Sequence, residues 1–315
     1  MSKFQQNLTF VRQLWANKRA IRDLLNSEEY IFLRRFPPGH FHSPIPNLRD
    51  ALNQATTAQA ASVVAVPAIN LNETCQTGLI EAFRQFYPEL PFPDRATEGA
   101  RYYLDNPFFS YGDGIILYSF MRQFQPRRIV EVGSGFSSAA MLDVNDWFFG
   151  RKLQFTFIEP YPDRLNSLLF ARDKGSCKIL VKGVQQVELD AFQSLEENDF
   201  LFVDSSHVGK TGSDVLYLLF QILPLLQKGV IAHFHDILWP FEYPKIWLHE
   251  GRAWNEAYFL RAFLQYNSAF EVLFFNSFMA MQHPGILSSK IPRALSPSSF
   301  DETIPNSSLW LRKVT

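Results

Sequence analysis

The segment from Arg128 to Ser138 constrains the fold of this chain more than any other. It reads as a buried strand over 128–132, then a turn with glycine at 133 and 135, then the start of a helix. Glycine lets a ligand approach the backbone, and a helix start offers free N–H groups. A second apolar strand, over 154–158, ends in a single acid, Glu159, which can hold two ribose hydroxyls. The pattern predicts a nucleoside-binding half-site on a doubly wound α/β sheet.

Strands and helices alternate from about residue 100 onward. Near-continuous apolar runs are typical of parallel strands that are covered on both faces. Such runs predict further strands over 177–181, 199–204, 230–234, 270–275 and 309–313. Helical spacing predicts helices over 112–124, 213–226 and 254–266. The long stretch 284–308 predicts a hairpin with an insertion between the last two strands.

The chain before this alternating region predicts a helical extension over 1–100, followed by a main domain over 101–315. Apolar residues at helical spacing predict a helix over 4–35, and the Pro- and Gly-rich residues 39–46 predict a loop. Loops and caps beside a doubly wound sheet often carry the substrate side of a site. We therefore expect the extension to form a lid and the acceptor-side walls.

The composition argues against several classes of partner. The net charge is −1, so no bulk field attracts nucleic acid or an anionic membrane. Two cysteines form no disulfide framework, no run of about 18 apolar residues is present, and the start of the chain lacks a signal core. These features predict a cytoplasmic protein. The aromatic content of 15% predicts aromatic-rich packing, and it is also compatible with a homodimer surface.

Polar side chains gather where the fourth and fifth predicted strands end. Asp204 and Asp236 come at these two tips, and carboxylates from adjacent tips can share Mg²⁺ or Mn²⁺. His207 has a side chain suited to general-base catalysis, which makes His207 and Asp204 the candidate catalytic residues. His235 is the candidate third metal ligand beside Asp236. The alternative is that the aspartates only cap the helices that follow.

A dinucleotide site is the competing interpretation of the glycine turn. The dinucleotide fingerprint has a third glycine, and Ser138 stands at that position here. Glu131, two residues before the first glycine, would repel a phosphate but would suit a cation. A nicotinamide-dependent oxidoreductase is therefore the weaker alternative.

The series Glu131, Gly133, Gly135 and Glu159 resembles the class I S-adenosylmethionine-dependent methyltransferases, whose ligand carries an amino group and no phosphate. The stretches 204–214, 233–237 and 250–256 resemble a group of bacterial members. The resemblance implies a Rossmann-like sheet of seven strands with the last strand antiparallel. It also implies a set of residues that bind S-adenosylmethionine: Tyr111, Glu131, Gly133, Ser134, Gly135, Ser137, Glu159, Gln185 and Asp204.

Within that family, the chain is similar to the catechol and macrolide-sugar O-methyltransferase types. These enzymes hold a divalent metal on acids at the ends of strands four and five, which implies a metal on Asp204 and Asp236. The resemblance implies O-methylation of a small-molecule or sugar hydroxyl. The chain departs from the pattern in having Ile237 where an Asn follows the second acid, and His207 where the catechol type has a lysine. A nucleoside-binding module without transfer activity is the alternative from another class.

Overall fold

The computed structural model of the chain divides into two compact units. One unit combines Met1–Ala60 with Pro244–Ala253, and the other combines Ala61–Tyr243 with Trp254–Thr315. The structure describes residues 18–19, 21–23, 26–28, 30–60, 63, 65–173, 175–300 and 306–315. Within these residues, no helix is both long enough and apolar enough to cross a membrane.

The described part of the smaller unit consists of helices and the loops between them. It contains α2 (Tyr30–Arg35), α3 (Leu48–Ala60) and α10 (Lys245–His249), and α3 contacts α10. The predicted loop over 39–46 is confirmed, because these residues form only turns and bends. Most of the helix predicted over 4–35 lies outside the described residues. The domain boundary at residue 100 stays a prediction, and so does the role of residues 1–100 as a lid over the acceptor.

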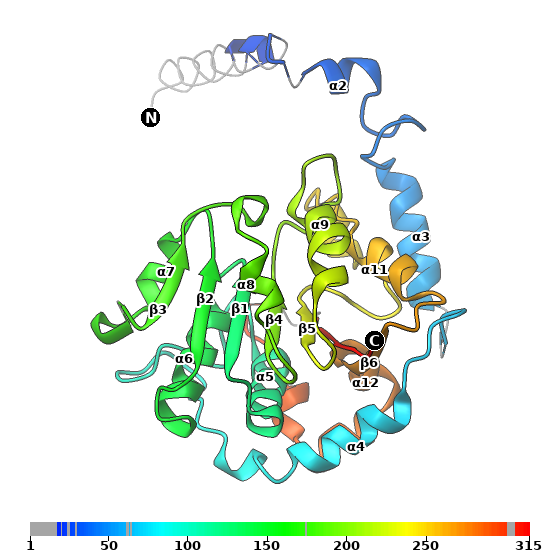
Figure 1. Cartoon of the computed structure of the whole chain (residues 1–315). Helices are drawn as coiled ribbons and strands as arrows, with labels where there is room; N and C mark the ends of the chain where they lie inside the picture. Colours follow the sequence, from blue (N-terminus) through cyan, green and yellow to red (C-terminus); the bar gives the residue numbers. More distant parts are fainter. Residues whose placement is uncertain are drawn as a thin grey trace, which may run out of the picture. The chain divides into compact units, whose positions relative to one another are not determined.

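The larger unit is built on one seven-stranded sheet with the order β3-β2-β1-β4-β5-β7-β6 (Figure 1). Strands β1 to β5 are parallel, and β7 pairs antiparallel with both β5 and β6. Their bounds are Arg128–Val132, Gln154–Ile158, Cys177–Leu180, Phe200–Val203, Ile231–Phe234, Phe270–Phe275 and Leu309–Lys313 for β1 to β7. The predicted doubly wound fold with an antiparallel last strand is confirmed. The strand order reverses where β1 lies between β2 and β4, the place where such sheets bind ligands.

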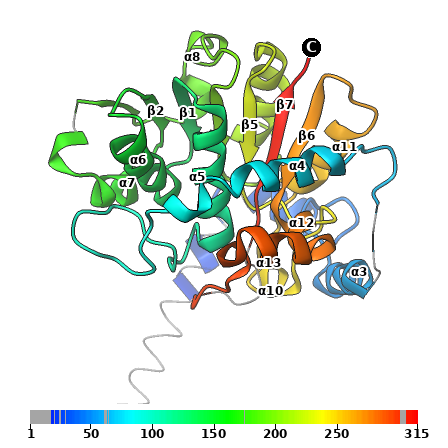
Figure 2. The same ribbon diagram turned by 90° about the horizontal axis from the view of Figure 1, so that it is seen from below.

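The helices α4, α5 and α12 pack together beside the sheet (Figure 2). The α-helices of this unit are α4 (Glu73–Phe83), α5 (Tyr111–Phe124), α6 (Phe136–Phe148), α7 (Asp163–Leu168), α8 (Asp190–Gln193), α9 (Asp214–Tyr217), α11 (Glu256–Leu264), α12 (Asn276–Gln282) and α13 (Pro284–Lys290). Short 3₁₀ turns cover Tyr87–Glu89, Ala171–Asp173, Val184–Gln186, Leu223–Leu225 and Pro292–Leu295. The buried ring of Trp310 on β7 stacks on Phe120 of α5 with ring centroids 4.0 Å apart, which joins this helix layer to the sheet.

The helix predicted over 213–226 differs from a regular α-helix. It begins as α9 at Asp214, continues as a π-helix over Leu218–Ile222 and ends as the 3₁₀ turn at Leu223–Leu225. Pro224 has no N–H to donate, so the regular hydrogen-bond ladder cannot continue through it. The predicted insertion between the last two strands is confirmed, because α12 and α13 lie between β6 and β7.

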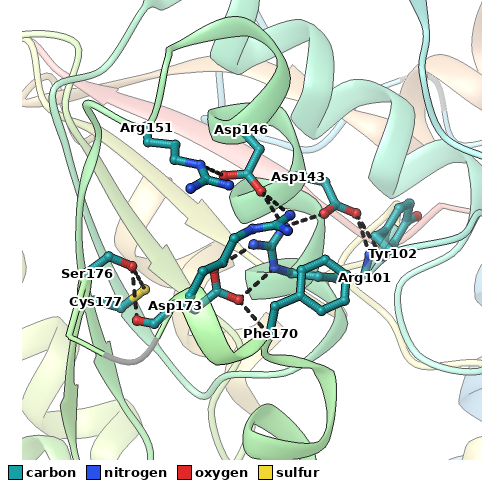
Figure 3. A network of polar contacts seen from close by, with 10 residues as sticks. Arg101, Tyr102, Asp143, Asp146, Arg151, Phe170, Asp173, Ser176 and Cys177 are labelled. Atoms are coloured by element: carbon teal, nitrogen blue, oxygen red, sulfur yellow. Dashed lines mark hydrogen bonds and ion pairs between the residues drawn. The ribbon is translucent and has the colours of Figure 1, made fainter. Parts of the chain in front are cut away.

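A buried ion network joins the segment before α5 to α6 (Figure 3). The guanidinium of Arg101, whose side chain is fully buried, contacts Asp143 at 2.6 Å, Asp146 at 2.9 Å and both oxygens of Asp173. Asp143 also accepts the backbone N–H groups of Arg101 and Tyr102. Because the carboxylates of Asp143 and Asp173 are nearly inaccessible to water, Arg101 compensates charges that solvent cannot reach. Asp146 also pairs with Arg151 and Arg172.

Replacement of Arg101 by Met should therefore lower the free energy of unfolding by about 3–5 kcal/mol, since buried carboxylates would lose their partner. Arg151 is the matched control, because it pairs with Asp146 at 2.8 Å while its side chain remains 54% exposed. Arg151→Met should cost less than about 1 kcal/mol. Urea denaturation of both variants measures the difference, and equal losses would show that the network does not stabilise the fold.

Candidate active site

A cleft of about 410 Å³ opens beyond the carboxyl ends of β1, β2 and β4. Four of the residues expected to bind the cofactor line it: Gly133, Glu159, Gln185 and Asp204. Its remaining lining is Val132, Ile158, Pro160, Tyr161, Gly183, Val184, Ser205, Ser206, Lys210, Ser213 and Asp214. The volume falls within the range of small-molecule and cofactor sites.

Glu159 is held in place at the tip of β2. One of its carboxylate oxygens accepts the N–H of Ser134 at 3.0 Å, and the other accepts the N–H of Tyr161 at 2.8 Å. These bonds fix the carboxylate beside the glycine turn and leave further lone pairs for donors from a ligand. The arrangement is suited to the two hydroxyls of a ribose.

Gly133 brings the tips of β1 and β4 together. Its φ of 79° lies in the left-handed region, and a Cβ atom there would overlap the carbonyl oxygen of Asp204. The protein itself therefore excludes a side chain at 133, before any ligand is considered. Glycine at this position is required by the packing of two strand ends.

Glu131 lies beneath the turn and is fully buried. The hydroxyls of Ser137 and Ser138, in the first turn of α6, donate to its two oxygens. Burial raises the pKa of Glu131 to about 8, against the opposing effect of the two serine hydrogen bonds. These contacts brace the turn, and a direct contact of Glu131 or Ser137 with the cofactor stays a prediction.

The other expected cofactor residues lie outside the cleft lining. The hydroxyl of Tyr111 donates to Asp94 at 3.0 Å. The N–H of Gly135 donates to the hydroxyl of Ser138 at 3.0 Å, and Ser134 contacts Glu159 through its backbone. Roles of these residues in binding the cofactor stay predictions.

A second group of polar atoms lies next to the cleft. Asp204, His207 and Asp236 each offer one ligand atom within 4.8 Å of the other two. Nε2 of His207 is 3.4 Å from Oδ1 of Asp204 and 3.6 Å from Oδ2 of Asp236. His207 and Asp236 have φ values of 58° and 55°, a region that non-glycine residues seldom occupy. Backbone strain of this kind is often found at functional sites.

The charged groups around His207 affect the protonation state of its imidazole ring. Burial alone would lower the pKa of His207, but hydrogen bonds to Asp204 and Glu256, with the charge of Asp236, raise it well above its usual value. The ring therefore favours its protonated form, which cannot accept a further proton. Binding of a cation would displace that proton.

His235 does not belong to this group of three. Its Nε2 is 3.3 Å from the carbonyl oxygen of Phe108 and 3.5 Å from Oδ1 of Asp236. The same carboxylate oxygen of Asp236 accepts the hydroxyl of Ser307 at 3.1 Å. The structure thus brings His207 to the two aspartates in the place where His235 was expected as a ligand.

Glu256 is a site residue that sequence reasoning did not identify. Its Oε2 lies 2.9 Å from Nδ1 of His207, and both side chains are nearly fully buried. The sequence places Glu256 at the start of a helix, where an acid is common. Nothing in the local pattern indicates that it contacts a histidine 49 positions earlier.

Residues 130–237 match the family model of a methyltransferase domain, Methyltransf_24. An uncharacterized protein of Archaeoglobus fulgidus is 35% identical over 168 residues, which cover 52% of this chain and 75% of that protein. Together with the match to the methyltransferase-domain model, the seven-stranded sheet with this strand order defines a class I methyltransferase. The chain belongs to the class I S-adenosylmethionine-dependent methyltransferase family and is such an enzyme.

The solved structures that are similar to this chain have low sequence identity to it. One is the O-methyltransferase TomG from Streptomyces achromogenes in complex with SAM, at 13% identity, 86% coverage of this chain, 100% of that chain and a TM-score of 0.40. Another, described as cmcI-D160 Mg-SAM, has 17% identity, 73% and 84% coverage, and a TM-score of 0.38.

Replacement of Glu159 by Ala should weaken the binding of S-adenosylhomocysteine by roughly one to two orders of magnitude. The reason is that hydrogen bonds to a charged group contribute about 1.5–3 kcal/mol. Isothermal titration calorimetry measures the change. The exposed Glu188 lies outside the cleft lining, so Glu188→Ala should bind as the wild type does. Unchanged affinity in the Glu159 variant would remove this residue from the cofactor site.

Proposed function

We propose that this methyltransferase transfers the methyl group of S-adenosylmethionine to a hydroxyl of a small molecule or sugar, with Mg²⁺ or Mn²⁺ at the acceptor side. One observation carries the proposal. Asp204 lines the cofactor cleft, and its carboxylate also meets Asp236 and His207 next to that cleft. The cleft proposed for the methyl donor and the candidate cation site therefore share Asp204.

The donor atoms of this group fit a divalent cation. Two carboxylates from neighbouring strand ends offer the oxygen ligands that Mg²⁺ and Mn²⁺ prefer. The side chains of Asp204 and Asp236 are 35% and 18% exposed, so both remain reachable by an acceptor molecule. A bound cation would orient the acceptor oxygen and lower the pKa of its hydroxyl, so that the hydroxyl could lose its proton to water. The oxygen would then bond to the methyl carbon while the carbon–sulfur bond breaks and S-adenosylhomocysteine leaves.

In the proposed reaction, side chains of the protein position the cofactor and the acceptor relative to each other. Methyl transfer requires the acceptor oxygen, the methyl group and the sulfur to lie in line, so the cofactor must be held firmly. Glu159 anchors the ribose, and Gly133 allows the turn to lie against the tip of β4. The aspartates hold the acceptor side at a fixed place relative to that cleft.

A metal-free mechanism is the second candidate, and the contact of 3.4 Å between His207 and Asp204 favours it. In this mechanism, the ring of His207 must first lose its own proton, and then, supported by Asp204, it takes the proton of the acceptor hydroxyl. Full transfer activity in the presence of EDTA distinguishes this candidate from the metal-assisted one. The homodimer and the cytoplasmic location stay predictions, and light scattering would check the first.

The acceptor class can be tested by following release of S-adenosylhomocysteine with panels of sugars, catechols and other phenols, against a blank without acceptor. Hydroxyl acceptors should raise the release above the blank in the presence of Mg²⁺ or Mn²⁺. Matched compounds with the hydroxyl replaced by hydrogen should not. Turnover of amines or carboxylic acids alone would contradict O-methylation.

Replacement of Asp236 by Asn should lower Mn²⁺ affinity by more than about tenfold, because a charged ligand is lost. Its affinity for S-adenosylhomocysteine should stay that of the wild type, since Asp236 does not line the cofactor cleft. Calorimetric titration with each ligand measures both. Asp163→Asn, at an exposed position on α7, is the control and should change neither value. Normal Mn²⁺ affinity in the Asp236 variant would contradict the metal site.

A further inference from the structure

The ring of His207 is oriented by a buried carboxylate. Nδ1 of His207 lies 2.9 Å from Oε2 of Glu256, and the two side chains are 6% and 2% exposed. When Glu256 is ionised, its carboxylate only accepts hydrogen bonds, and Nδ1 is then the nitrogen that carries the hydrogen in this contact. The other ring nitrogen, Nε2, is therefore the one presented to Asp204 and Asp236.

The backbone around His207 is fastened to the start of α11. The N–H groups of Asn255 and Glu256 donate to the carbonyl oxygen of His207 at 3.1 and 3.2 Å. The side-chain amide of Asn255 makes two hydrogen bonds to the backbone of Gly209, at 2.6 and 3.2 Å. The ring of Trp254 lies against His207 with centroids 4.4 Å apart. These contacts hold His207 in a backbone conformation that costs free energy on its own.

The direction of Nε2 distinguishes His207 from His235. At 3.4 and 3.6 Å, the distances from Nε2 of His207 to the two aspartate oxygens are too long for strong hydrogen bonds, yet the three atoms face one another. Nε2 of His235 contacts the carbonyl oxygen of Phe108, and its Nδ1 has no hydrogen-bond partner in the described part of the chain. Histidines that bind metals usually donate their other N–H to a carboxylate or carbonyl. His207 meets this condition through Glu256.

We propose that Nε2 of His207 is the third protein ligand of the cation, and that Glu256 is a positioning residue that fixes the ring of His207 for this task. The inference rests on the proposed function, because it assigns the ligands of the same cation. It replaces the expected base role of His207 with a ligand role, since a nitrogen that binds a cation cannot also accept a proton.

The ligand role can be tested with Mn²⁺ as the probe and without any acceptor. Electron spin-echo envelope modulation of bound Mn²⁺ detects a directly coordinated imidazole nitrogen. The wild type and the control His235→Gln should both show this nitrogen coupling, whereas His207→Gln should lose it. Coupling that persists in the His207 variant, or disappears only in the His235 variant, would overturn the assignment.

The positioning role can be tested with Glu256→Gln, in which His207 is intact. Loss of an outer carboxylate lowers metal affinity by about 10–100-fold, so Mn²⁺ binding should weaken by this factor. Affinity for S-adenosylhomocysteine should not change, which also shows that the variant is folded. Glu242→Gln is the matched control: Glu242 accepts the hydroxyl of Tyr258 at 3.1 Å and should leave Mn²⁺ affinity unchanged.

Different results would overturn the metal site and the positioning role of Glu256. Absence of Mn²⁺ affinity in the wild type, with normal binding of S-adenosylhomocysteine, would overturn the metal role and this inference together. Mn²⁺ binding that depends on Asp236 but is the same in wild type and Glu256→Gln would overturn the positioning role of Glu256 and leave the proposed function standing.

Discussion

The close approach of the β1 and β4 tips is the constraint on which the site depends. These strands pair in parallel, and the backbone of Gly133 meets the carbonyl of Asp204 with no room for a side chain. The same peptide of Asp204 is thereby fixed against the glycine turn while its carboxylate faces His207. A parallel pairing that buries apolar residues on both faces thus sets the positions of polar groups at its edge.

Much of the sheet could be predicted because its strands are apolar runs that end at glycines or acids. The strands over 128–132, 154–158, 270–275 and 309–313 have the expected bounds, and Asp204 and Asp236 lie at adjacent tips because β4 pairs with β5. Such strands can be predicted from local sequence patterns because each one is itself a run of buried apolar residues.

The remaining parts of the site depend on contacts between distant segments. The contact of Glu256 with His207 and the positive φ values of His207 and Asp236 leave no trace in residue spacing. From the sequence, His235 was the expected ligand beside Asp236 and His207 the expected base, and only the folded loop brings His207 close to both aspartates. The buried pairing of Arg101 with three aspartates could not be predicted from the sequence either, because its partners lie far along the chain, in α6 and in the turn before β3.

Asp204 belongs to two neighbouring sites: it lines the cleft beyond β1 and β4, and its carboxylate faces His207 and Asp236. Any ligand that shifts this residue in one pocket changes the free energy of binding in the other, because the two share a rigid strand end. Such coupling is reciprocal: the factor by which a cation changes affinity for the nucleoside equals the factor by which the nucleoside changes affinity for the cation. Under the proposed function, Asp204 is therefore the residue through which the methyl donor and the acceptor side would be linked thermodynamically.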